Sequence, residues 1–582
     1  MRCEPLPRGG VHRGRRDSLE PGRSVRAGIL VLILLLALAL RLWGIGFGLP
    51  HQYHPDEAHE VYRALQLGAG SFNFDRIAKG GYFYLLSLEY GVYYLALRVT
   101  GAVASPEDFA VTFIQDPSAL WLMGRVTTAA LGTLTVFLVY LLGAASYGPV
   151  AGLLAAVLLA VNPLHVEDSH YITVNVPVTL LVVACLLFLL DLARSGRCRS
   201  YLFSGLFFGL ALQTKLSAAA VVVPFALAHL IQTRKAGGRF SASLFNRKLL
   251  CALLCAAGIY ILGTPGILFK AGAVIDSTLS IFTSSPTEFI ETSFSSPAEA
   301  LAMRRSPWSG YAEDLLASLG WPALVAALIG VLYAVFRRTE ADWLLASLCL
   351  LYYPLIASAK TLRAPSYLTL MLPGLLLLAG RFIAETITWI PARRTASTML
   401  VAVTVFLCLS PALASVRFDS RIARKDTRTL AKEWIETHVP EGSKILLDAG
   451  RFQSHEAPSL QESRENLEVK IRELADGEQG KALFLTLKKD HLEGKTYDLT
   501  STNWGSEVET LDYYKRSGYR YIIVSDSISR LYRTPLAEKM FPKSVAFYGA
   551  LKADPDLVLR QRFEASPDRP GPSISIYEIR PR

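Results

Sequence analysis

A short segment near the start of the sequence places two carboxylates beside two imidazoles. Residues 53–59 read Tyr-His-Pro-Asp-Glu-Ala-His. A carboxylate in this setting can act as a base towards a hydroxyl or an amine. Asp56 and Glu57 are therefore candidate catalytic residues, and His54 is a candidate substrate-binding residue. The alternative is a solvated helix start with Asp56 as its cap, and the local sequence favours neither interpretation.

A second cluster of the same type occupies residues 162–171, which read Asn-Pro-Leu-His-Val-Glu-Asp-Ser-His-Tyr. Asp168 is its candidate catalytic residue, and His165 and His170 are candidate substrate-binding residues. Asn175 follows within the next apolar run, where it could bind substrate or satisfy a neighbouring backbone group. An ordinary polar loop between helices is the alternative, but two acid–imidazole clusters on one face favour a functional site.

Cations and a tyrosine complete the set of candidate groups. Lys79, Lys360 and Arg363 lie beside apolar runs, Tyr367 follows Arg363, and Lys215 lies between two apolar segments. An ionisable group near the membrane interior is a functional candidate, and Arg363 with Tyr367 could hold a phosphate through charge-assisted hydrogen bonds. Interfacial snorkelling is the alternative; it is favoured for Lys215 and balanced for Lys360 and Arg363.

The elements that must position these groups are membrane-spanning helices. Of the 582 residues, 51% are hydrophobic and only 19% are charged, which excludes a disordered chain and argues against a soluble enzyme. The 118–144 run contains Arg125, which requires a partner or a cavity. About eleven spans are predicted, at 27–46, 118–144, 149–166, 171–192, 200–214, 216–233, 249–269, 319–336, 342–359, 366–388 and 396–414.

The distribution of basic residues predicts the orientation of these spans. The net charge is +11, yet residues 415–582 contain 28 Lys and Arg against 26 Asp and Glu, so most of the excess lies in the apolar part. Basic loops of a membrane protein face the cytoplasm. We therefore expect a cytoplasmic N-terminus and basic tail (1–26), and a location in the plasma or inner membrane. Both acid clusters then lie outside, on the large first outer loop (47–117) and the 165–170 loop.

Two regions outside the spans have recognisable patterns. The aromatic stretch 82–99 predicts a helix lying at the membrane interface, with a further span as the alternative. Residues 415–582 form a soluble unit with an amphipathic helix at 427–439 and strands at 444–448, 519–526 and 573–579. With eleven spans this α/β domain also lies outside, and the transmembrane domain covers residues 27–414.

Taken in order, these features resemble the polytopic GT-C glycosyltransferases, in particular the glycosyltransferase family 39-like group of protein O-mannosyltransferases and aminoarabinose transferases. The resemblance covers nearly the whole chain and includes the C-terminal domain. The motifs that carry it are HPDEAH at 54–59, NPLHVEDSHYITVNVP at 162–177, GLALQTKLSAAAVVVP at 209–224 and RAPSYLTLMLPGLLLLAG at 363–380.

The resemblance implies a polytopic helical fold and an inverting transfer of a hexose or pentose from a polyprenyl-phosphate donor to a lipid, glycan or protein acceptor. It implies that Asp56 is the catalytic carboxylate and that Lys79, Arg363 and Tyr367 contact the donor phosphate. Glycines follow Lys79 where the family has prolines. The second family aspartate falls at Asn175, so a two-carboxylate site would need Asp168 or Glu167.

Other interpretations remain open at this stage. A lipid or glycan transporter without transferase activity would place polar groups near the membrane midplane in repeated halves, and no repeat is evident. A membrane scaffold with a partner-binding C-terminal domain would leave the acid–cation set unexplained. A divalent metal, Mg²⁺ or Mn²⁺, could be held by Asp56, Glu57 and Asp168, although no spacing demands it. No basic groove predicts a nucleic-acid partner.

Overall fold

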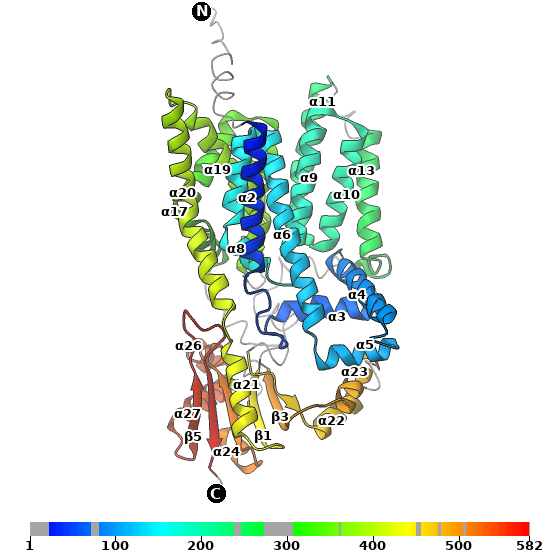
Figure 1. The fold of residues 1–582 in the computed structure, drawn as a ribbon, viewed down its shortest axis with the longest axis vertical. Coiled ribbons are helices and arrows are strands. Elements are labelled where there is room, and N and C mark those ends of the chain that lie inside the picture. Colours follow the sequence, from blue (N-terminus) through cyan, green and yellow to red (C-terminus); the bar gives the residue numbers. More distant parts are fainter. Residues whose placement is uncertain are drawn as a thin grey trace, which may run out of the picture.

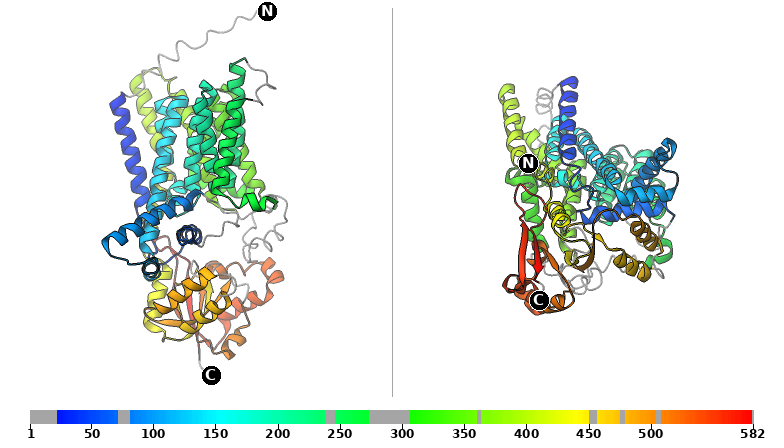
Figure 2. Two further views of the ribbon diagram at one scale, coloured as in Figure 1. Left: turned by 90° about the vertical axis from the view of Figure 1, so that its right-hand side faces the viewer. Right: turned by 60° about the horizontal axis from the view of Figure 1, so that its bottom comes forward.

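The structure is a computed structural model that describes residues 22–70, 81–237, 246–272, 306–359, 363–449, 456–474, 479–503 and 508–580. A bundle of long helices forms one half of the molecule, and a smaller α/β region forms the other (Figure 1). The start of α2 (Arg23–Leu42) lies at the end of the bundle that is far from the α/β region (Figures 1 and 2).

The described helices make the chain a polytopic α-helical membrane protein. Seven segments of the described residues are long and apolar enough to cross a membrane. Four further predicted spans correspond to shorter helices, α7, α10, α13 and α19, so every predicted span has a helical counterpart, while the number of crossings stays a prediction. The bundle elements are α2 (Arg23–Leu42), α6 (Ser118–Tyr147), α7 (Pro149–Ala160), α9 (Asn175–Ser195), α10 (Cys198–Thr214), η1 (Leu216–Val221), α11 (Val222–Lys235), α13 (Arg247–Gly263), α17 (Pro307–Arg337), α18 (Glu340–Ser358), η2 (Pro365–Leu370), α19 (Leu372–Ile387) and α20 (Arg393–Ile422).

One helix begins much earlier than the sequence predicts. A span was expected from residue 319, but α17 starts at Pro307 and contains a break at Gly320, whose φ is +69°. Glycine adopts a positive φ without the steric cost that a side chain imposes, and Pro322 follows two residues later. The apolar run therefore marks only the second half of α17, and the more polar first half escaped a prediction based on hydropathy.

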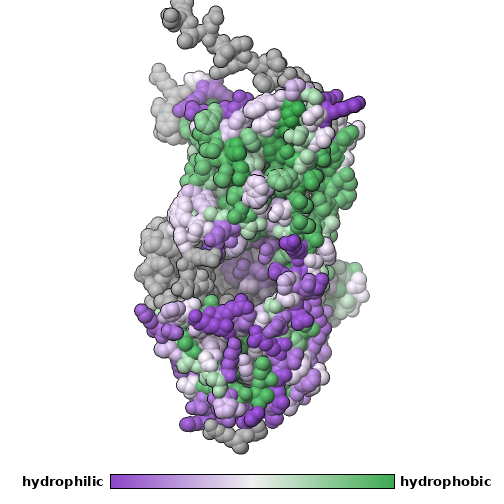
Figure 3. Space-filling model, turned by 90° about the vertical axis from the view of Figure 1, so that its left-hand side faces the viewer, coloured by the Kyte–Doolittle hydropathy of each residue, from purple (hydrophilic) through white to green (hydrophobic). Residues whose placement is uncertain are grey.

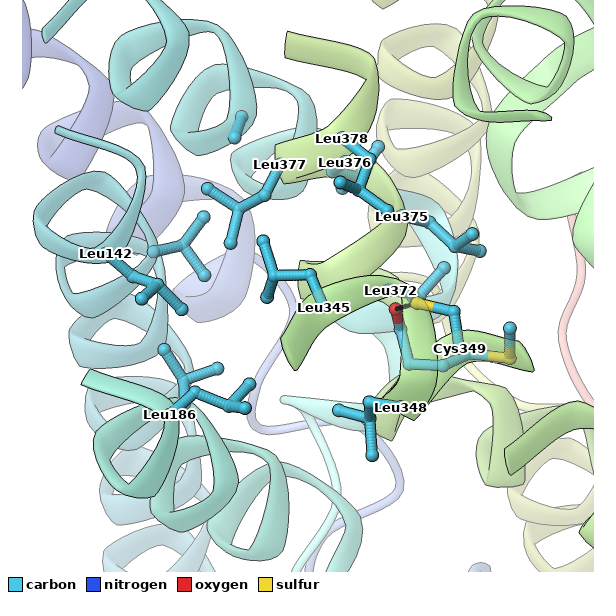
Figure 4. Close-up of a cluster of buried hydrophobic side chains, with 14 of the residues drawn as sticks. Leu142, Leu186, Leu345, Leu348, Cys349, Leu372, Leu375, Leu376, Leu377 and Leu378 are labelled. Atoms are coloured by element: carbon cyan, nitrogen blue, oxygen red, sulfur yellow. Dashed lines mark hydrogen bonds between the residues drawn. The ribbon is translucent and has the colours of Figure 1, made fainter. Parts of the chain in front are cut away.

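The core of the bundle is built almost wholly from aliphatic side chains. Figure 4 shows leucines of α6, α9, α18 and α19 pointing into one another, among them Leu142, Leu186, Leu345 and Leu376, all of which are buried. Glycines allow the closest approaches: a Cβ added to Gly152 of α7 would lie 2.6 Å from the carbonyl oxygen of Tyr140. Small residues at such crossings let helix backbones pack directly in a membrane.

Hydrogen bonds identify the two ends of the bundle. At one end Lys235 donates to the carbonyl of Ala193 and to Glu340, while Lys248 donates to the carbonyl of Gly196. These contacts gather the basic connections, together with the start of α2, on the side away from the α/β region (Figure 1). The acid clusters lie at the other end, which we call the site end.

Four helices lie at the site end. The helix predicted over 82–99 is present as α4, and α3 and α4 run across the bundle rather than along it (Figure 1). The α4 helix packs against the ends of two bundle helices, because the Tyr84 hydroxyl donates to the carbonyl of Gly263 and Gly81 approaches Thr214. The four are α3 (Pro55–Gly68), α4 (Gly81–Thr100), α5 (Pro106–Gln115) and α8 (Pro163–Asp168).

The C-terminal α/β region contains one six-stranded sheet in the order β2-β3-β1-β4-β6-β5. β2, β3, β1 and β4 are parallel, whereas β6 and β5 pair antiparallel at the other side. The strands are β1 (Lys444–Ala449), β2 (Gln461–Glu462), β3 (Thr496–Asn503), β4 (Tyr521–Ser525), β5 (Leu557–Phe563) and β6 (Ile574–Ile579). The helices are α21 (Thr427–His438), α22 (Arg464–Leu474), α23 (Gln479–Asp490), α24 (Leu511–Arg516), α25 (Asp526–Ser529), α26 (Pro535–Met540) and α27 (Pro542–Ala553).

The α/β region is held against the site end at two places. The Tyr53 hydroxyl is 2.9 Å from the Thr429 hydroxyl of α21, and the Arg428 guanidinium lies 4.0 Å from the centre of the Tyr53 ring. On the other side, Phe484 of α23 contacts Phe113 of α5. Between bundle and α/β region the molecular surface is hollowed, and the visible part of the hollow is hydrophilic (Figure 3).

Candidate functional site

Asp56 lies in the first turn of α3 at the site end. Pro55 occupies the first helical position, where its fixed φ suits helix entry, and the carboxylates of Asp56 and Glu57 complement the helix dipole there. Asp56 is exposed, and within the described part of the chain it makes no hydrogen bond or ion pair. A carboxylate with unoccupied oxygens at the end of the bundle is available to a substrate.

Glu57 points the other way and is completely buried. Both of its oxygens lie 2.8 Å from the Arg125 guanidinium of α6, and the backbone N–H of Ile172 also donates to it. Arg125 additionally donates to the carbonyls of Ile45 and Phe47. The ion pair thus ties α3 to the loop before it and to α6, which gives Arg125 the partner that its sequence position requires.

His54 lies directly before α3 and stacks on a ring from the second acid cluster. Its imidazole centre is 4.0 Å from that of Tyr171, and the two planes are inclined by 23°. Burial lowers the pKa of His54, against the opposing effects of Glu57 and Asp56. Nδ1 of His54 is buried and has no hydrogen-bond partner among the described residues. A neutral imidazole with a vacant nitrogen can accept or donate one hydrogen bond to a substrate.

Asp168 ends the short helix α8 and is buried beneath this surface. The Thr369 hydroxyl of η2 donates to its carboxylate. Burial is the main cause that raises the pKa of Asp168 to about 7, while Glu167 and Asp56 act in the same direction and Lys215 opposes them. Asp56, Asp168 and Lys215 therefore lie within electrostatic reach of one another, although they come from α3, α8 and the end of α10.

Lys215, for which the sequence favoured interfacial snorkelling, contacts two of the other candidate residues. It lies at the junction of α10 and η1, where its Nζ donates to Oδ1 of Asn175 at 2.7 Å and lies 4.2 Å from the centre of the Tyr367 ring. Tyr367 in turn is within electrostatic reach of Asp56. The available signal was the break between two apolar segments at a lysine, since an ionisable group at that depth needs a reason to be there.

Arg363 lies beside this group on the connection before η2. Its guanidinium forms an ion pair with Asp314 of α17, and its side chain fits against Gly310, where any Cβ would collide with it. Arg363 is about 30% exposed, so its outer face is open to solvent. Two other predicted cations, Lys79 and Lys360, lie outside the described residues.

The two histidines of the second cluster face inward, towards α2. His165 Nδ1 is 2.8 Å from the Arg41 guanidinium, and both residues are fully buried. His170 places its ring nitrogens near the carbonyls of Val166 and Trp43, and Asp419 of α20 lies 3.6 Å away. These contacts connect α8 and the residues that follow it to α2 and α20, and both imidazoles are buried.

The donor set at the site end does not match a metal centre. Among the described residues no group of three His, Cys, Asp or Glu side chains could hold a metal ion. Glu57, one of the three predicted ligands, has both oxygens occupied by Arg125.

One protein-family model matches part of the chain. Residues 121–262 match the family model described as dolichyl-phosphate-mannose-protein mannosyltransferase. This range contains two of the four motifs that carry the predicted resemblance, at 162–177 and 209–224. Over this part of the chain the match agrees with the predicted resemblance to protein O-mannosyltransferases. No curated protein sequence matches the chain.

Several solved structures also align with this chain at low sequence identity. The apo oligosaccharyltransferase of Archaeoglobus fulgidus is 12% identical, with a TM-score of 0.47 over 87% of this chain and 70% of that one. ArnT of Cupriavidus metallidurans bound to undecaprenyl phosphate is 12% identical, with a TM-score of 0.46 over 94% and 98%. The mycobacterial arabinofuranosyltransferase AftD is 15% identical, with a TM-score of 0.41 over 96% and 42%.

Proposed function

We propose that this protein is a membrane glycosyltransferase that moves a sugar from a polyprenyl-phosphate donor to an acceptor on the extracytoplasmic face. The observation that carries the proposal is the gathering of Asp56, Asp168, Lys215 and Tyr367, from four separate elements, at one end of a membrane bundle. An exposed carboxylate and a cation at the same end of the bundle suit a sugar-phosphate substrate. The family model matched by residues 121–262 supports the donor class.

Asp56 is the base of the proposed reaction. It takes the proton of the acceptor hydroxyl or amine, whose oxygen or nitrogen then forms a bond to the anomeric carbon. The bond between the anomeric carbon and the phosphate oxygen breaks, and the lipid phosphate leaves with the electron pair. Attack from the side opposite the leaving group inverts the anomeric configuration. A positioned base of this kind contributes about 10²–10⁴-fold to the rate.

Lys215 and Arg363 stabilise the leaving phosphate. Fixed positive charge where negative charge develops is usually the largest electrostatic contribution to such a reaction. Lys215 is held by Asn175 and by the face of Tyr367, so little reorganisation is needed when the phosphate arrives. Arg363 exchanges its contact with Asp314 for the phosphate, and the predicted residues Lys79 and Lys360 are further candidates for the same role.

The remaining predicted residues position this machinery in the proposal. Glu57 fixes the start of α3 through Arg125, and Asp168 with Thr369 sets the position of η2 and hence of Tyr367. His54 and Tyr171 form the wall beside Asp56. The bilayer supplies the donor lipid, and the hollow below the bundle admits a lipid, glycan or protein acceptor.

Measurements of lipid-phosphate binding and of sugar transfer can separate the proposed roles of Lys215 and Asp56. Undecaprenyl phosphate is titrated into the wild type, Asp56→Asn and Lys215→Met in nanodiscs, and each variant is tested for restoring sugar transfer in cells that lack the protein. Asp56→Asn should bind the lipid like the wild type yet lose transfer by about 100-fold or more. Lys215→Met should bind about 10- to 100-fold more weakly, because a charge-assisted hydrogen bond is lost.

Lys552→Met, which removes an exposed lysine of α27, is the matched control and should change neither quantity. Membrane insertion is compared by quantifying each protein in purified membranes. Transfer by Asp56→Asn at the wild-type rate would refute the assignment of the base, and unchanged lipid binding by Lys215→Met would refute the assignment of the phosphate contact.

A further inference from the structure

The connection between α2 and α3, residues 43–54, sets the position of the proposed base, because α3 begins directly after it. Arg125 of the bundle donates hydrogen bonds to the carbonyls of Ile45 and Phe47 in this connection. The carbonyl of Tyr53, close to its end, accepts a hydrogen bond from the α/β region instead. The bundle and the α/β region therefore hold different parts of the same connection.

The contact at Tyr53 involves its backbone, its ring and its hydroxyl group. Arg428 of α21 donates to the Tyr53 carbonyl at 3.3 Å, and its guanidinium lies 4.0 Å from the centre of the ring. The Tyr53 hydroxyl is 2.9 Å from that of Thr429. The ring also packs against Gly48, where an added Cβ would lie 2.7 Å from it. These contacts, which we call the Tyr53 clamp, bury the residue and fix both its backbone and its side chain.

Arg428 is itself held firmly within the α/β region. Its guanidinium forms two hydrogen bonds with the carboxylate of Asp426, at 2.8 and 2.7 Å. Asp426 lies against Gly571, where an added Cβ would collide with the carboxylate, and the Thr427 hydroxyl donates to the carbonyl of Pro572. A guanidinium fork fixed by a carboxylate loses little freedom when it makes a further hydrogen bond. The clamp is thus anchored on the segment that leads into β6.

Only two residues separate Tyr53 from Asp56, and the backbone of each is restricted. The ring of Pro55 fixes its φ. A residue that precedes proline is confined to extended conformations, and His54 adopts one, with φ −108° and ψ 121°. The His54 ring is further held by its stacking on Tyr171. A displacement of Tyr53 would therefore be passed on to Asp56 rather than absorbed between them.

The carboxylate of Asp56 depends on this backbone for its position. It is exposed, and in the described part of the chain it makes no hydrogen bond or ion pair of its own. On the C-terminal side, the next residue, Glu57, is fixed by Arg125. On the N-terminal side, the Tyr53 clamp is the matching restraint. Such restraints matter because a misplacement of about 1 Å can cost an enzyme about 100-fold in rate.

We propose that Arg428 is a positioning residue for the transfer reaction. Through Tyr53 it holds the start of α3, and with it the carboxylate of Asp56, in the orientation that the reaction requires. The α/β region thereby contributes to the chemistry at the site end in addition to covering it. This role rests on the proposed glycosyltransferase function, whereas the effect of Arg428 on residues 43–54 can be measured without it.

Hydrogen exchange of the full-length protein in nanodiscs measures the effect of the clamp directly. The amides of Phe47 and His51 are hydrogen-bonded within the connection, so their exchange reports its opening. Arg428→Gln should accelerate exchange in residues 45–54 about tenfold, because a charge-assisted hydrogen bond to the Tyr53 carbonyl is lost.

Arg424→Gln is the matched control for this measurement. Arg424 lies between α20 and α21 and pairs with the exposed Asp568 of the α/β region. In the described part of the chain its side chain bonds to no residue of the 43–54 connection. Arg424→Gln should therefore leave the exchange of residues 45–54 at the wild-type rate.

Lipid binding and sugar transfer are then measured as for Asp56→Asn and Lys215→Met. Arg428→Gln should bind undecaprenyl phosphate like the wild type yet transfer sugar about 10- to 100-fold more slowly, because the base is misplaced. Arg428→Lys retains the positive charge beside the ring and guards against a misfolded Arg428→Gln. It should transfer more slowly than the wild type but faster than Arg428→Gln, and Arg424→Gln should match the wild type.

Wild-type exchange in residues 45–54, or wild-type transfer by both Arg428 variants, would overturn the proposal. A loss of transfer matched by an equal loss of lipid binding, or shared by Arg424→Gln, would also overturn it, since the α/β region would then act through docking alone. Asp56→Asn separates the two proposals. Wild-type transfer by Asp56→Asn would refute the base, whereas an inactive Asp56→Asn beside a fully active Arg428→Gln would refute only the clamp.

Discussion

At the scale of single residues, local sequence and tertiary contact contributed differently to the site. The sequence singled out Asp56 because its carboxylate precedes a helix beyond the first apolar run. It could not separate the roles of Asp56 and Glu57, because the difference arises from Arg125, which lies 68 positions further along the chain from Glu57. The sequence favoured snorkelling for Lys215 for the same reason: its contacts with Asn175 and Tyr367 exist only in the folded bundle.

The buried pair of Glu57 and Arg125 predicts a large cost when one partner is removed. Glu57→Gln or Arg125→Gln alone should destabilise the protein by about 3–5 kcal/mol, because an uncompensated charge or donor stays buried. The double variant Glu57→Gln with Arg125→Gln should cost clearly less than the sum of the two. Thermal unfolding in detergent provides the double-mutant cycle. Additive losses would show that the two side chains do not depend on each other.

The raised pKa of Asp168 predicts a specific pH dependence of stability. The unfolded group titrates near 3.8 and the folded group near 7, so the folded state retains a proton that unfolding releases. Stability therefore falls as pH rises through this window and is level above it. Asp168→Asn lacks the titration, and its stability relative to the wild type should rise by on the order of 2 kcal/mol between pH 5 and pH 8.

The control for this measurement is Glu107→Gln, which alters an exposed carboxylate of α5. Its stability difference from the wild type should be flat over the same range. Asp448 also titrates near pH 7, but it is present in every variant and cancels in the difference. Parallel pH profiles for Asp168→Asn and the wild type would contradict the assigned pKa.

At the scale of elements, hydropathy predicted the helices well and the sheet only in part. All eleven apolar runs became helices because a membrane span needs an apolar surface along its whole length. Strands β1, β4 and β6 were predicted from their buried, β-branched sequences. β2 was missed because it has only two residues, and β3 (TYDLTSTN) and β5 (LVLRQRF) because polar side chains interrupt them.

The contact between α6 and α7 predicts intolerance of a single methyl group. Gly152→Ala would place a Cβ 2.6 Å from the Tyr140 carbonyl oxygen and 2.8 Å from the Ala144 nitrogen. The backbone atoms cannot move aside as the end of a flexible side chain can. We therefore expect the free energy of unfolding to fall by about 1–3 kcal/mol, as measured by thermal unfolding. Gly258→Ala in α13 has nothing within 4 Å and should be neutral or stabilising by up to about 1 kcal/mol. Equal effects of the two variants would contradict the packing argument.

At the scale of the whole molecule, the bundle has a basic end and a site end, and the α/β region covers the latter. The basic connections follow the positive-inside pattern, which the sequence alone could indicate. The hollow between bundle and α/β region could not be predicted, because it depends on how α21 and α23 dock onto Tyr53 and α5. The sequence thus predicts an orientation for the spans, whereas the docking of the α/β region against the site end is seen only in the structure.

This arrangement predicts that the two ends of the chain lie on opposite sides of the membrane. A tag placed before Arg23 should resist protease in intact spheroplasts, whereas a tag after Arg580 should be removed. Permeabilised spheroplasts, in which both tags become accessible, are the control. Protection of both tags, or loss of both, would require an even number of crossings, and protection of both would place the α/β region on the wrong face for the proposed acceptor.

The most direct test of the proposed function is mass spectrometry of membrane lipids and envelope glycans from cells with and without this protein. We expect one sugar to disappear from an envelope glycan, lipid or protein, and the corresponding polyprenyl-phosphate sugar to accumulate. Asp56→Asn, inserted in the membrane at the wild-type level, should reproduce both changes. An unaltered glycan profile together with an unaltered pool of lipid-linked sugars would contradict the account.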